Sequence, residues 1–351
     1  MDTKVVVLNE EKQNLEAIKA AGDVIRTGGL VAFPTETVYG LGANALNPEA
    51  VKKIFIAKGR PQDNPLIVHV SDFNIEDLVQ YIPPIAKRFM NRFWPGPLTL
   101  IMKKSDKVPE ITSAGLDSVG IRMPSNYLAN KLIKEAGVPI AAPSANISGK
   151  PSPTNIEMCI EDLMGKVEYI IGGERCDVGL ESTIVDCTVE PSCILRPGGI
   201  TVEMLKEIEP DIYIDPSIMK KVEKDFKPKA PGMKYRHYAP KAPVKIISGD
   251  LEKTIAKINE IVQNYIDDGK KVGIMASDET IERYSNAIVK SLGSRNNLST
   301  VAKNLFKTLR EFDNCDVDVI LSEAFEEKGV GIAVMNRLKK AAGFDIIDVD
   351  K

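Results

Sequence analysis

The chain contains few of the residues that support metal, disulfide or membrane chemistry. Its 351 residues include five cysteines and two histidines. The cysteines are scattered, odd in number and without a Cys-x-x-Cys spacing, which argues against a zinc site and fits a reducing, cytoplasmic compartment. Two histidines cannot form a histidine-rich metal site, so no candidate residue is assigned to a metal. No apolar run approaches the roughly 20 residues of a membrane span, and the N-terminus does not resemble a signal peptide.

The common nucleotide-binding and hydrolase motifs are also missing. There is no G-x-x-x-x-G-K-[ST], which excludes a P-loop enzyme, and no G-x-S-x-G, which argues against an α/β-hydrolase. Gly40-Leu41-Gly42 imitates a dinucleotide fingerprint, but Pro48 falls within the start of the following helix and no acidic strand end follows at the required spacing. These glycines are interpreted as a tight turn that aims Thr35 and Thr37 into a cleft.

Charge is unevenly distributed along the chain. The net charge is −3, yet residues 217–245 hold nine Lys or Arg and two acidic residues, a local excess of +7 that leaves −10 for the rest. A basic strip on an acidic protein is either a solvated linker or a segment that lies over an anionic ligand. The acidic remainder is poorly suited to a nucleic-acid coat protein, which relies on many phosphate contacts.

Hydrophobic periodicity predicts an α/β protein with two domains. The expected boundaries are 1–210 for the first domain, 211–243 for a basic, proline-rich linker and 244–351 for a second domain. In the first domain we expect strands at 5–8, 30–34, 66–70, 98–102, 119–123, 139–142, 169–171 and 182–186, and helices at 14–27, 47–58, 83–94, 126–136 and 201–208. In the second, strands at 244–247, 271–275 and 317–321 alternate with helices at 251–268, after 275 and at 301–312, which predicts a mostly parallel sheet.

Two short polar clusters stand where helices or strands break. Lys58 and Arg60 follow a helix whose start reads as an Asn47 N-cap with Pro48 at its first position, and prolines then fix the backbone. A fixed backbone suits a Lys and Arg that bind phosphate oxygens, although cations also suit a helix C-terminus. The second cluster, with Ser144 and Asn146, follows an apolar strand. Together they predict a site for a phosphate-bearing ligand.

Three further polar residues allow both a functional and a structural interpretation. Arg122, at a strand end, could form a bidentate pair with a carboxylate or be a surface residue at a sheet edge. His69 alternates with apolar residues in a strand, where a lone histidine is more often structural. Arg196, in Arg-Pro-Gly-Gly, could equally be a solvated residue in a plain turn.

The combination of motifs resembles the YrdC-like family of threonylcarbamoyl-AMP synthases. The motifs are Phe33-Pro-Thr-Glu-Thr-Val-Tyr-Gly-Leu-Gly42, Lys58-x-Arg60-Pro61 with Asn64-Pro-Leu66, Trp94-Pro-Gly-Pro-Leu-Thr99, Arg122-Met-Pro124, Ala142-Pro-Ser-Ala-Asn146, Glu181-Ser-Thr-Ile-Val-Asp186 and Leu195-Arg-Pro-Gly198. They cover about residues 10–208. The segments 231–240 and 329–337 are similar to the longer, two-domain form of the family.

The resemblance implies a fold and a reaction. The fold is a twisted mixed sheet with a deep positive groove, followed by a smaller Rossmann-like parallel α/β domain. The reaction joins L-threonine, bicarbonate or CO2 and ATP into threonylcarbamoyl-AMP and pyrophosphate. A separate transferase complex then passes the threonylcarbamoyl group to the adenosine next to the anticodon of tRNA. Catalysis would come from alignment and charge neutralisation, without a protein nucleophile.

The resemblance also implies roles for single residues. The catalytic set is Lys58, Arg60, Ser144 and Asn146. The ATP site contains these four with Asn64, Ser118, Ser152 and Arg196, and Tyr235 and His237 would join it from a linker that covers the groove. The threonine site contains Thr35, His69, Arg122, Ala142 and Ser182. Mg²⁺ is expected, bound mainly by the ATP phosphates.

Two other functions remain open from the sequence. The first is a module that binds double-stranded RNA or tRNA without chemistry, and a weak RNA contact is also compatible with the enzyme. The second is carbamoyl adenylation by a related domain, whose usual acylphosphatase and zinc-finger segments this chain lacks. Threonine-dependent pyrophosphate release from ATP separates all three.

Overall fold

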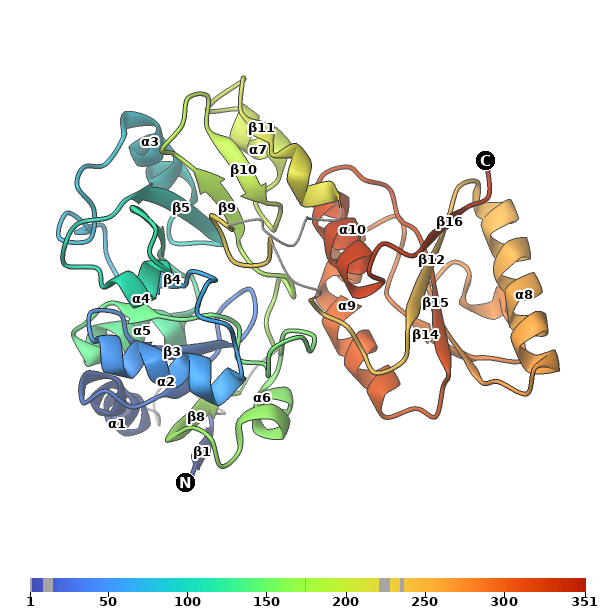
Figure 1. Ribbon diagram of the computed structural model, residues 1–351, viewed down its shortest axis with the longest axis horizontal. Helices are drawn as coiled ribbons and strands as arrows, with labels where there is room; N and C mark the ends of the chain where they lie inside the picture. The colour runs from blue at the N-terminus through green and yellow to red at the C-terminus, as the bar shows by residue number, and fades with distance from the viewer. Residues whose placement is uncertain (1, 9–14, 174, 221–227, 234–236) are drawn as a thin grey trace. The chain divides into compact units, whose positions relative to one another are not determined.

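The alternating helix and strand patterns form two separate units in the computed structural model of the chain (Figure 1). The structure describes residues 2–8, 15–173, 175–220, 228–233 and 237–351. The first unit contains Met1–Ser148, Ser152–Ile218 and Val222–Lys234. The second contains Gly149–Pro151, Met219–Lys221 and Tyr235–Lys351. Within the described residues, no helix is both long enough and apolar enough to cross a membrane.

The first unit is built on a mixed sheet that has eleven strands among the described residues. Their order is β1-β8-β2-β3-β7-β4-β6-β5-β9-β10-β11. The strands are β1 (Lys4–Val7), β2 (Val31–Phe33), β3 (Gly40–Asn44), β4 (Ile67–His69), β5 (Leu98–Lys103), β6 (Ser118–Arg122), β7 (Ile140–Ala141), β8 (Tyr169–Gly172), β9 (Thr183–Asp186), β10 (Cys193–Arg196) and β11 (Tyr213–Ile214). The sheet contains both parallel pairs, such as β4/β6, and antiparallel pairs, such as β5/β6, so the expected mixed sheet is confirmed.

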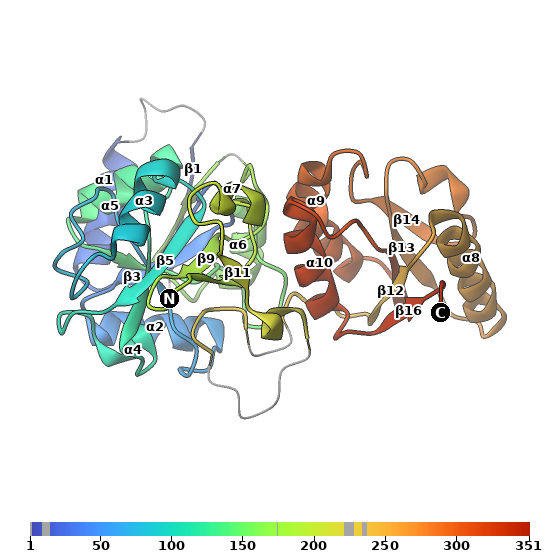
Figure 2. The same cartoon turned by 90° about the horizontal axis from the view of Figure 1, so that it is seen from above.

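Helices cover the sheet of the first unit. They are α1 (Leu15–Arg26), α2 (Pro48–Lys58), α3 (Pro84–Phe93), α4 (Glu110–Ser113), α5 (Tyr127–Ala136), α6 (Ile156–Leu163) and α7 (Val202–Lys206). Helices α1 and α5 lie side by side and pack on Phe33 and Ile171 (Figures 1 and 2). The alternate residues Ala32 and Ile170 point to the opposite face, into the main core. This alternation is the period-2 pattern of strands that are buried on both faces.

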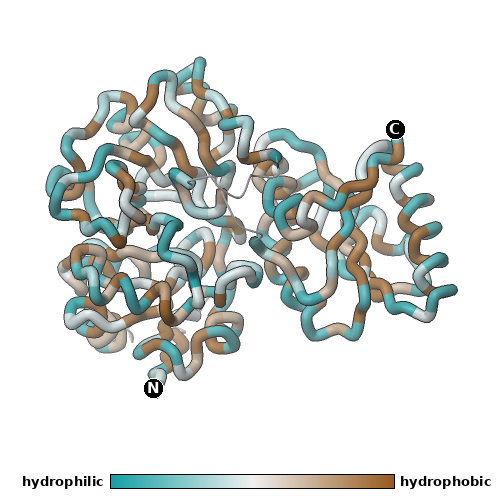
Figure 3. Tube along the Cα trace, in the orientation of Figure 1, coloured by the Kyte–Doolittle hydropathy of each residue, from teal (hydrophilic) through white to brown (hydrophobic). Residues whose placement is uncertain are grey.

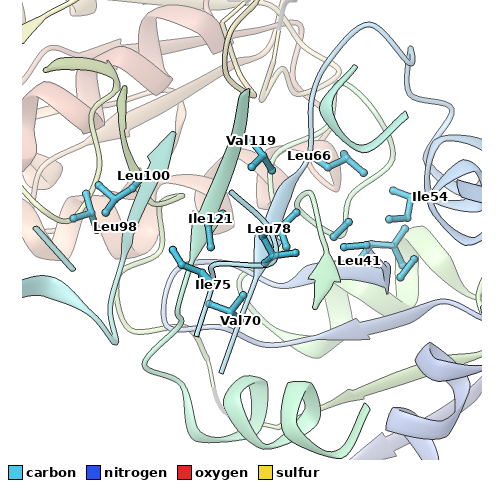
Figure 4. Packing of buried hydrophobic residues seen from close by; sticks show 14 of the residues in the cluster. Leu41, Ile54, Leu66, Val70, Ile75, Leu78, Leu98, Leu100, Val119 and Ile121 are labelled. Atoms are coloured by element: carbon cyan, nitrogen blue, oxygen red, sulfur yellow. The ribbon is translucent and has the colours of Figure 1, made fainter. Parts of the chain in front are cut away.

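The strands β4, β6, β5, β9 and β10 bury one face in the same main core. Figure 4 shows Leu98, Leu100, Val119 and Ile121 in this packing. Because successive strand residues point to opposite faces, the residues between them lie on the other side of the sheet. Those intervening residues include polar side chains, and they form the candidate site.

Helix α2 carries Lys58 to that site. Asn47 caps the helix, and its side chain accepts from the backbone N–H groups of Glu49 and Ala50. Pro48 occupies the first turn, and Gly59 ends the helix with φ of 61°, in the left-handed region that glycine adopts without strain. The predicted N-cap and helix end are confirmed. Lys58 is therefore the last residue of a rigid element.

The second unit is a doubly wound parallel domain. Its described residues form a five-stranded sheet in the order β14-β13-β15-β12-β16, and every pair is parallel. The elements are β12 (Val244–Ser248), α8 (Leu251–Asp267), β13 (Val272–Ala276), β14 (Ile288–Ser291), α9 (Leu298–Asp313), β15 (Val319–Glu323), α10 (Val330–Ala341) and β16 (Ile346–Asp348). Helix α8 covers one face of the sheet, and α9 and α10 pack together on the other (Figures 1 and 2). Figure 3 shows that the central strands of this unit are mainly hydrophobic, whereas hydrophilic and hydrophobic residues alternate along α8.

A short segment from the middle of the sequence belongs to the second unit. Gly149–Pro151 is held there by helix α9, where the buried Arg310 donates from Nε and Nη2 to the Pro151 carbonyl at 3.0 and 2.7 Å. The backbone N–H of Ala239 donates to the Gly149 carbonyl at 3.0 Å. Two separate elements of the second unit thus fix the backbone of this segment.

Two secondary-structure predictions were wrong, and one of the alternatives left open by the sequence is excluded. The end of the turn predicted at residues 35–42 is instead part of strand β3 (Gly40–Asn44). The helix predicted after residue 275 is replaced by a short 3₁₀ turn at Ile281–Arg283 and strand β14. Arg196, for which a solvated turn was an open reading, ends strand β10 and is only 6 % exposed.

Candidate functional site

A row of buried polar side chains crosses one face of the first unit's sheet. The register aligns His69 of β4 with Arg122 of β6, Arg122 with Thr99 of β5, Thr99 with Ile184 of β9, and Ile184 with Arg196 of β10. Aligned residues on neighbouring strands share a face, so four polar side chains from four strands lie in one transverse line. We call His69, Arg122, Thr99 and Arg196 the polar row. All four are at most 6 % exposed.

Arg196 and Thr99 are connected through Ser182. The Arg196 guanidinium donates to the Ser182 carbonyl from Nε at 3.0 Å and to its hydroxyl from Nη2 at 3.1 Å. The hydroxyl oxygens of Ser182 and Thr99 are 2.8 Å apart. Arg196 also donates from Nη1 to the carbonyl of Pro231, which lies in the basic linker segment of the sequence, at 3.3 Å. The linker therefore contacts one end of the polar row.

Arg122 lies against Glu36, and neither group is satisfied. Nη2 of Arg122 and Oε1 of Glu36 are 2.8 Å apart, with side-chain exposures of 4 % and 9 %. The two side chains therefore form an ion pair without a hydrogen bond of good geometry between them. Among the described residues, Nη2 and Nε of Arg122 and both Glu36 oxygens have no hydrogen-bond partner. Unpaired buried donors and acceptors are costly, and they are found where a ligand supplies the missing partners.

His69 is held in its neutral form. Burial lowers the pKa of His69 from 6.5 to about 3, and the positive charge of Arg122 adds to this effect. The ring meets the ring of Phe33 edge to face at 6.3 Å. Its Nδ1 atom has no hydrogen-bond partner in the part of the chain that the structure describes. A neutral imidazole next to Arg122 can exchange hydrogen bonds with a ligand without repelling the arginine.

The His69 environment predicts acid sensitivity. Between pH 6.5 and about 3 the unfolded chain binds a proton at His69 that the folded chain excludes, so stability falls as pH decreases through this window. We expect the free energy of unfolding of the wild type to fall more steeply than that of His69→Gln, by up to about 1.4 kcal/mol per pH unit. Denaturant unfolding at pH steps from 7 to 4.5 measures this difference. Identical slopes would show that His69 is not buried in its neutral form.

Lys58 joins the two polar clusters that the sequence predicted. Its ammonium group, on a residue only 1 % exposed, donates to the backbone carbonyls of Ser144, at 2.6 Å, and of Asn146. The Ser144 hydroxyl donates to Oδ1 of Asn146 at 2.5 Å. We call Lys58, Ser144 and Asn146 the lysine cluster. Lys58 thus fixes the backbone that presents the serine and asparagine side chains.

Arg60 and Asn64 lie on the loop that follows Lys58. Nη2 of Arg60 donates back to the carbonyls of Asn64 and Pro65 at 3.4 and 3.3 Å. Asn64 is 1 % exposed, and its Oδ1 has no partner among the described residues. The loop is therefore closed by its own arginine, and a buried acceptor is left for a ligand.

Thr35 belongs to a loop that connects the polar row with the lysine cluster. Its hydroxyl donates to the Val38 carbonyl at 2.7 Å and lies 2.7 Å from the Thr37 hydroxyl. The same loop accepts from the backbone of Val178 through the Glu36 carbonyl, at 2.9 Å, and donates from Tyr39 to Pro153, also at 2.9 Å. Thr35 and Thr37 therefore hold the loop in shape.

Two other predicted residues lie near this loop. Ser152 is buried, and its hydroxyl donates to Oε1 of Glu181, next to Ser182, at 2.6 Å. The methyl group of Ala142 packs in the apolar cluster with Phe33, so only the Ala142 backbone can face a ligand.

Ser118 lies apart from the polar row. It begins strand β6, which Arg122 ends, so the two are on the same face and about 13 Å apart at roughly 3.3 Å per residue. Gly120 lies between them on this face, where side chains of the neighbouring strands approach it: a Cβ there would meet Thr99 Cγ2 at 3.1 Å and Ile101 Cγ1 at 3.8 Å. The glycine thus makes room for its neighbours between Arg122 and Ser118.

Of the two linker residues predicted to bind ATP, the structure describes only one. Tyr235 lies outside the described residues. His237 belongs to the second unit, where its ring lies 5.6 Å from the ring of Tyr238. Tyr238 in turn stacks on Phe306 at 4.9 Å.

Sequence reasoning did not assign Glu36, Thr99 or Glu181 to the site. Glu36 stands between two threonines that had been singled out, so its position was a usable signal. Thr99 interrupts an apolar strand, and it is 0 % exposed. A buried polar residue in such a strand indicates a site or a hydrogen-bonded pair, and here it pairs with Ser182.

The site provides neither a metal centre nor a thiol nucleophile among its described residues. No group of three or more His, Cys, Asp or Glu side chains gathers there or elsewhere in the described ranges. The thiol of Cys176 interacts electrostatically with Glu36 and Arg122. Burial raises the pKa of this thiol to about 12, which keeps it protonated. The arrangement can bind anions and carboxylates, and it can align them.

Comparisons with known families cover both units. The sequence profile of the family described as "Telomere recombination" matches residues 23–198. That of the family described as "Threonylcarbamoyl-AMP synthase, C-terminal domain" matches residues 200–343. Together they span most of the chain.

Individual relatives match over nearly their whole length. The chain is 51 % identical to the threonylcarbamoyl-AMP synthase of Pyrococcus abyssi over 333 residues, which are 95 % of this chain and 96 % of the relative. It is 48 % identical to the threonylcarbamoyl-AMP synthase of Bacillus subtilis over 345 residues, 98 % of each chain. The crystal structure of P. abyssi Sua5 complexed with L-threonine superposes with a TM-score of 0.92 at 48 % identity, and covers 99 % of both chains.

Proposed function

The chain belongs to the threonylcarbamoyl-AMP synthase family in its two-domain form, and from this premise we propose that the polar row and the lysine cluster bind the two large substrates of the reaction. The protein makes threonylcarbamoyl-AMP for the threonylcarbamoyladenosine modification of tRNA. L-Threonine, bicarbonate or CO2, and ATP are the substrates, and pyrophosphate is released. A separate transferase complex consumes the product.

The unsatisfied Arg122 guanidinium is the observation that carries the threonine assignment. It is buried, positively charged, and has Nε and Nη2 without hydrogen-bond partners among the described residues. A carboxylate supplies two acceptors that match two guanidinium donors. Arg122 therefore takes the threonine carboxylate, while His69, Ser182, Thr35 and the Ala142 backbone surround the rest of the amino acid.

ATP is assigned to the remainder of the same face. The nucleoside lies toward Ser118, about 13 Å along β6 from the arginine that holds threonine. The phosphates lie between them, near the hydroxyl and amide groups that Lys58 fixes, with Asn64, Ser152, Arg60 and Arg196 as further polar partners. For the reaction, the α-phosphate would have to face the threonine end, with the β- and γ-phosphates turned away from it toward the lysine cluster.

Mg²⁺ is assigned to the phosphates of ATP rather than to a protein cage. Mg²⁺ keeps several water ligands and commonly binds through substrate phosphates with few carboxylates. The described residues, which bring no set of three metal-ligating side chains together, suit such an ion. When bound, it would neutralise the charge of the triphosphate.

The chemistry needs alignment more than covalent catalysis. The threonine amine adds to CO2 or bicarbonate, and the carbamate oxygen then attacks the α-phosphorus as pyrophosphate leaves. Holding the carbamate and the phosphate in line converts this into an intramolecular step, and cationic donors stabilise the charge that develops. Arg196 and the lysine cluster are placed for both tasks.

The basic linker is proposed to cover the site. Ala230 and Met233 are buried in the first unit, and the Pro231 carbonyl accepts from Arg196. Lys229 lies 3.4 Å from the buried Asp186. Residues 228–233 of the linker, which the structure describes, would thus cover one end of the polar row, and excluding water there would protect the labile carbamate.

Changing Arg122 tests this assignment. With ATP and bicarbonate saturating, Arg122→Lys is expected to lower kcat/KM for threonine about 100-fold, because an ammonium cannot form the bidentate pair. The KM for ATP should stay within a few-fold of wild type. Threonine-dependent release of pyrophosphate measures both, and thermal unfolding verifies that the variant is folded.

The same assay separates the competing functions. An RNA-binding module would release no pyrophosphate in the wild type, and a carbamoyl-adenylating enzyme would use carbamoyl phosphate without threonine. If Arg122→Lys reacted at the wild-type rate at low threonine concentration, the threonine carboxylate would bind to a group other than Arg122.

A further inference from the structure

Glu36 is a buried charged group in contact with Arg122 that the proposed reaction leaves without a task. It lies between Thr35 and Thr37 on the loop after β2, and its backbone is fixed because its carbonyl accepts from Val178 at 2.9 Å. Its side chain is 9 % exposed and lies 2.8 Å from Arg122. Both carboxylate oxygens lack hydrogen-bond partners among the described residues. A purely structural counter-ion of Arg122 would be expected to form directional hydrogen bonds with it.

The pair has the charges of a site for a free amino acid. An α-amino acid carries a carboxylate and an ammonium group on the same carbon, and a buried arginine beside a buried carboxylate presents the opposite charges at the same short spacing. Once the substrate carboxylate engages Arg122, the charge of Glu36 needs a new partner, and the ammonium group lies next to it. His69 does not compete for this role because burial and Arg122 keep it neutral.

We propose that Glu36 binds the ammonium group of threonine and takes up the proton that this nitrogen must lose before it reacts. The N–H bond breaks, its electron pair stays on nitrogen, and the proton forms an O–H bond with a Glu36 oxygen. The lone pair then forms the N–C bond. With CO2, one C=O electron pair moves to oxygen and the nitrogen releases its second proton to water; with bicarbonate, the C–O bond to the hydroxyl group breaks and that group leaves as water with one of the two protons. This inference rests on the proposed function, since it assumes that threonine is bound through Arg122.

Substrate binding itself would prepare Glu36 for this step. In the free protein Arg122 compensates the Glu36 charge at 2.8 Å. A threonine carboxylate on Arg122 cancels that compensation, and a buried carboxylate without a counter-charge is strongly destabilised. Accepting a proton removes the cost. The reaction would therefore be coupled to the arrival of an amino acid with both charges.

The other titratable groups near Glu36 do not replace it. Cys176 is electrostatically coupled to both Glu36 and Arg122, but burial raises its pKa to about 12, so its protonated thiol cannot take up a proton. Glu181 already accepts a hydrogen bond from Ser152 at 2.6 Å, and no ion pair joins it to Arg122 among the described residues. Glu36 is the carboxylate in ionic contact with Arg122.

Glu36→Gln tests the proposal, because the amide keeps the size of the side chain but cannot take up the proton. At pH 7 we expect kcat for threonine-dependent pyrophosphate release to fall at least 100-fold, with the KM for threonine within about tenfold of wild type. The loss of kcat relative to wild type should become smaller as pH rises, because more threonine then carries an unprotonated amine without the help of a base. Glu36→Asp, which keeps a carboxylate, should recover part of the rate.

The matched control is Glu168→Gln. Glu168 also accepts a hydrogen bond, from the Leu30 backbone at 2.8 Å, but lies outside the site, so the kcat of Glu168→Gln should equal that of wild type.

A Glu36→Gln enzyme with wild-type kcat at pH 7 would overturn the proposal and leave Glu36 as a structural counter-ion. A loss of kcat that is the same at every pH would overturn it too. A wild type without threonine-dependent activity would instead overturn the proposed function. If Glu36→Gln does not fold, the pH dependence of Glu36→Asp decides, since a longer proton path should shift its profile relative to wild type and an unchanged profile would contradict the role.

Discussion

Lys58→Met is expected to reduce threonylcarbamoyl-AMP formation about 1000-fold and to destabilise the first unit at the same time. Methionine keeps the length of the side chain but leaves the Ser144 and Asn146 carbonyls without the ammonium donor they now share. Removing one preorganised donor from an active site commonly costs two to three orders of magnitude in rate. Unsatisfied buried carbonyls should lower the free energy of unfolding by about 2 kcal/mol or more. Pyrophosphate release and denaturant unfolding measure the two effects.

Lys53→Met is the matched control for this prediction. Lys53 lies on the same helix, and its ammonium group donates to the Gly28 carbonyl at 2.7 Å, away from the site. It should lose some stability but keep its rate. If Lys58 contacted only phosphate, its variant would lose activity with unchanged stability. A rate within a few-fold of wild type would remove the lysine cluster from the ATP site altogether.

Glu323→Leu is expected to have the largest effect on the second unit. Glu323 ends β15, is 0 % exposed and accepts hydrogen bonds from Thr280, Tyr284 and Arg295, the last two at 2.7 and 2.6 Å. Breaking a buried ionic network by removing one partner typically costs about 3–5 kcal/mol, because the remaining groups stay buried without a counter-charge. We therefore expect the second unit to unfold at least about 10 °C lower.

Thermal unfolding of the full chain, followed by hydrogen exchange in each unit, measures this loss. The control is Glu282→Gln, a nearby exposed carboxylate whose loss should be nearly neutral. Exchange rates in β13 and β15 that do not change in Glu323→Leu would contradict the prediction.

Local signals in the sequence were sufficient for much of the fold. The Asn47 cap, Pro48 and Gly59 fixed the limits of α2 because each residue has a backbone role that does not depend on distant contacts. Strand β3 was missed for the opposite reason. Gly42 suggested a turn, but a side chain there would approach Ile140 to 2.7 Å and Phe33 to 2.8 Å. Its glycine allows close packing within the sheet, which only the tertiary structure shows.

The candidate site was predictable in part. Motifs that resemble a known family brought Lys58, Ser144 and Asn146 together, and the structure joins them by hydrogen bonds. The hydrogen bonds themselves could not be predicted, because Lys58 donates to backbone carbonyls and not to side chains that a motif records. The Glu36–Arg122 contact was also hidden, since its partners are distant in sequence and meet only through the order of strands in the sheet.

That strand order also has a consequence for the growing chain on the ribosome. Lys4 of β1 pairs with Tyr169 of β8, and Arg196 finds its partner Pro231 later still. Pairing over such long sequence separations is slow and must wait until the distant segment has been synthesised. The first strand emerges long before the segment that covers its edge, and the polar row is complete only after β10 has been made. The strands of the second unit, in contrast, all lie between Val244 and Asp348, so its sheet can assemble from one continuous stretch of newly made protein.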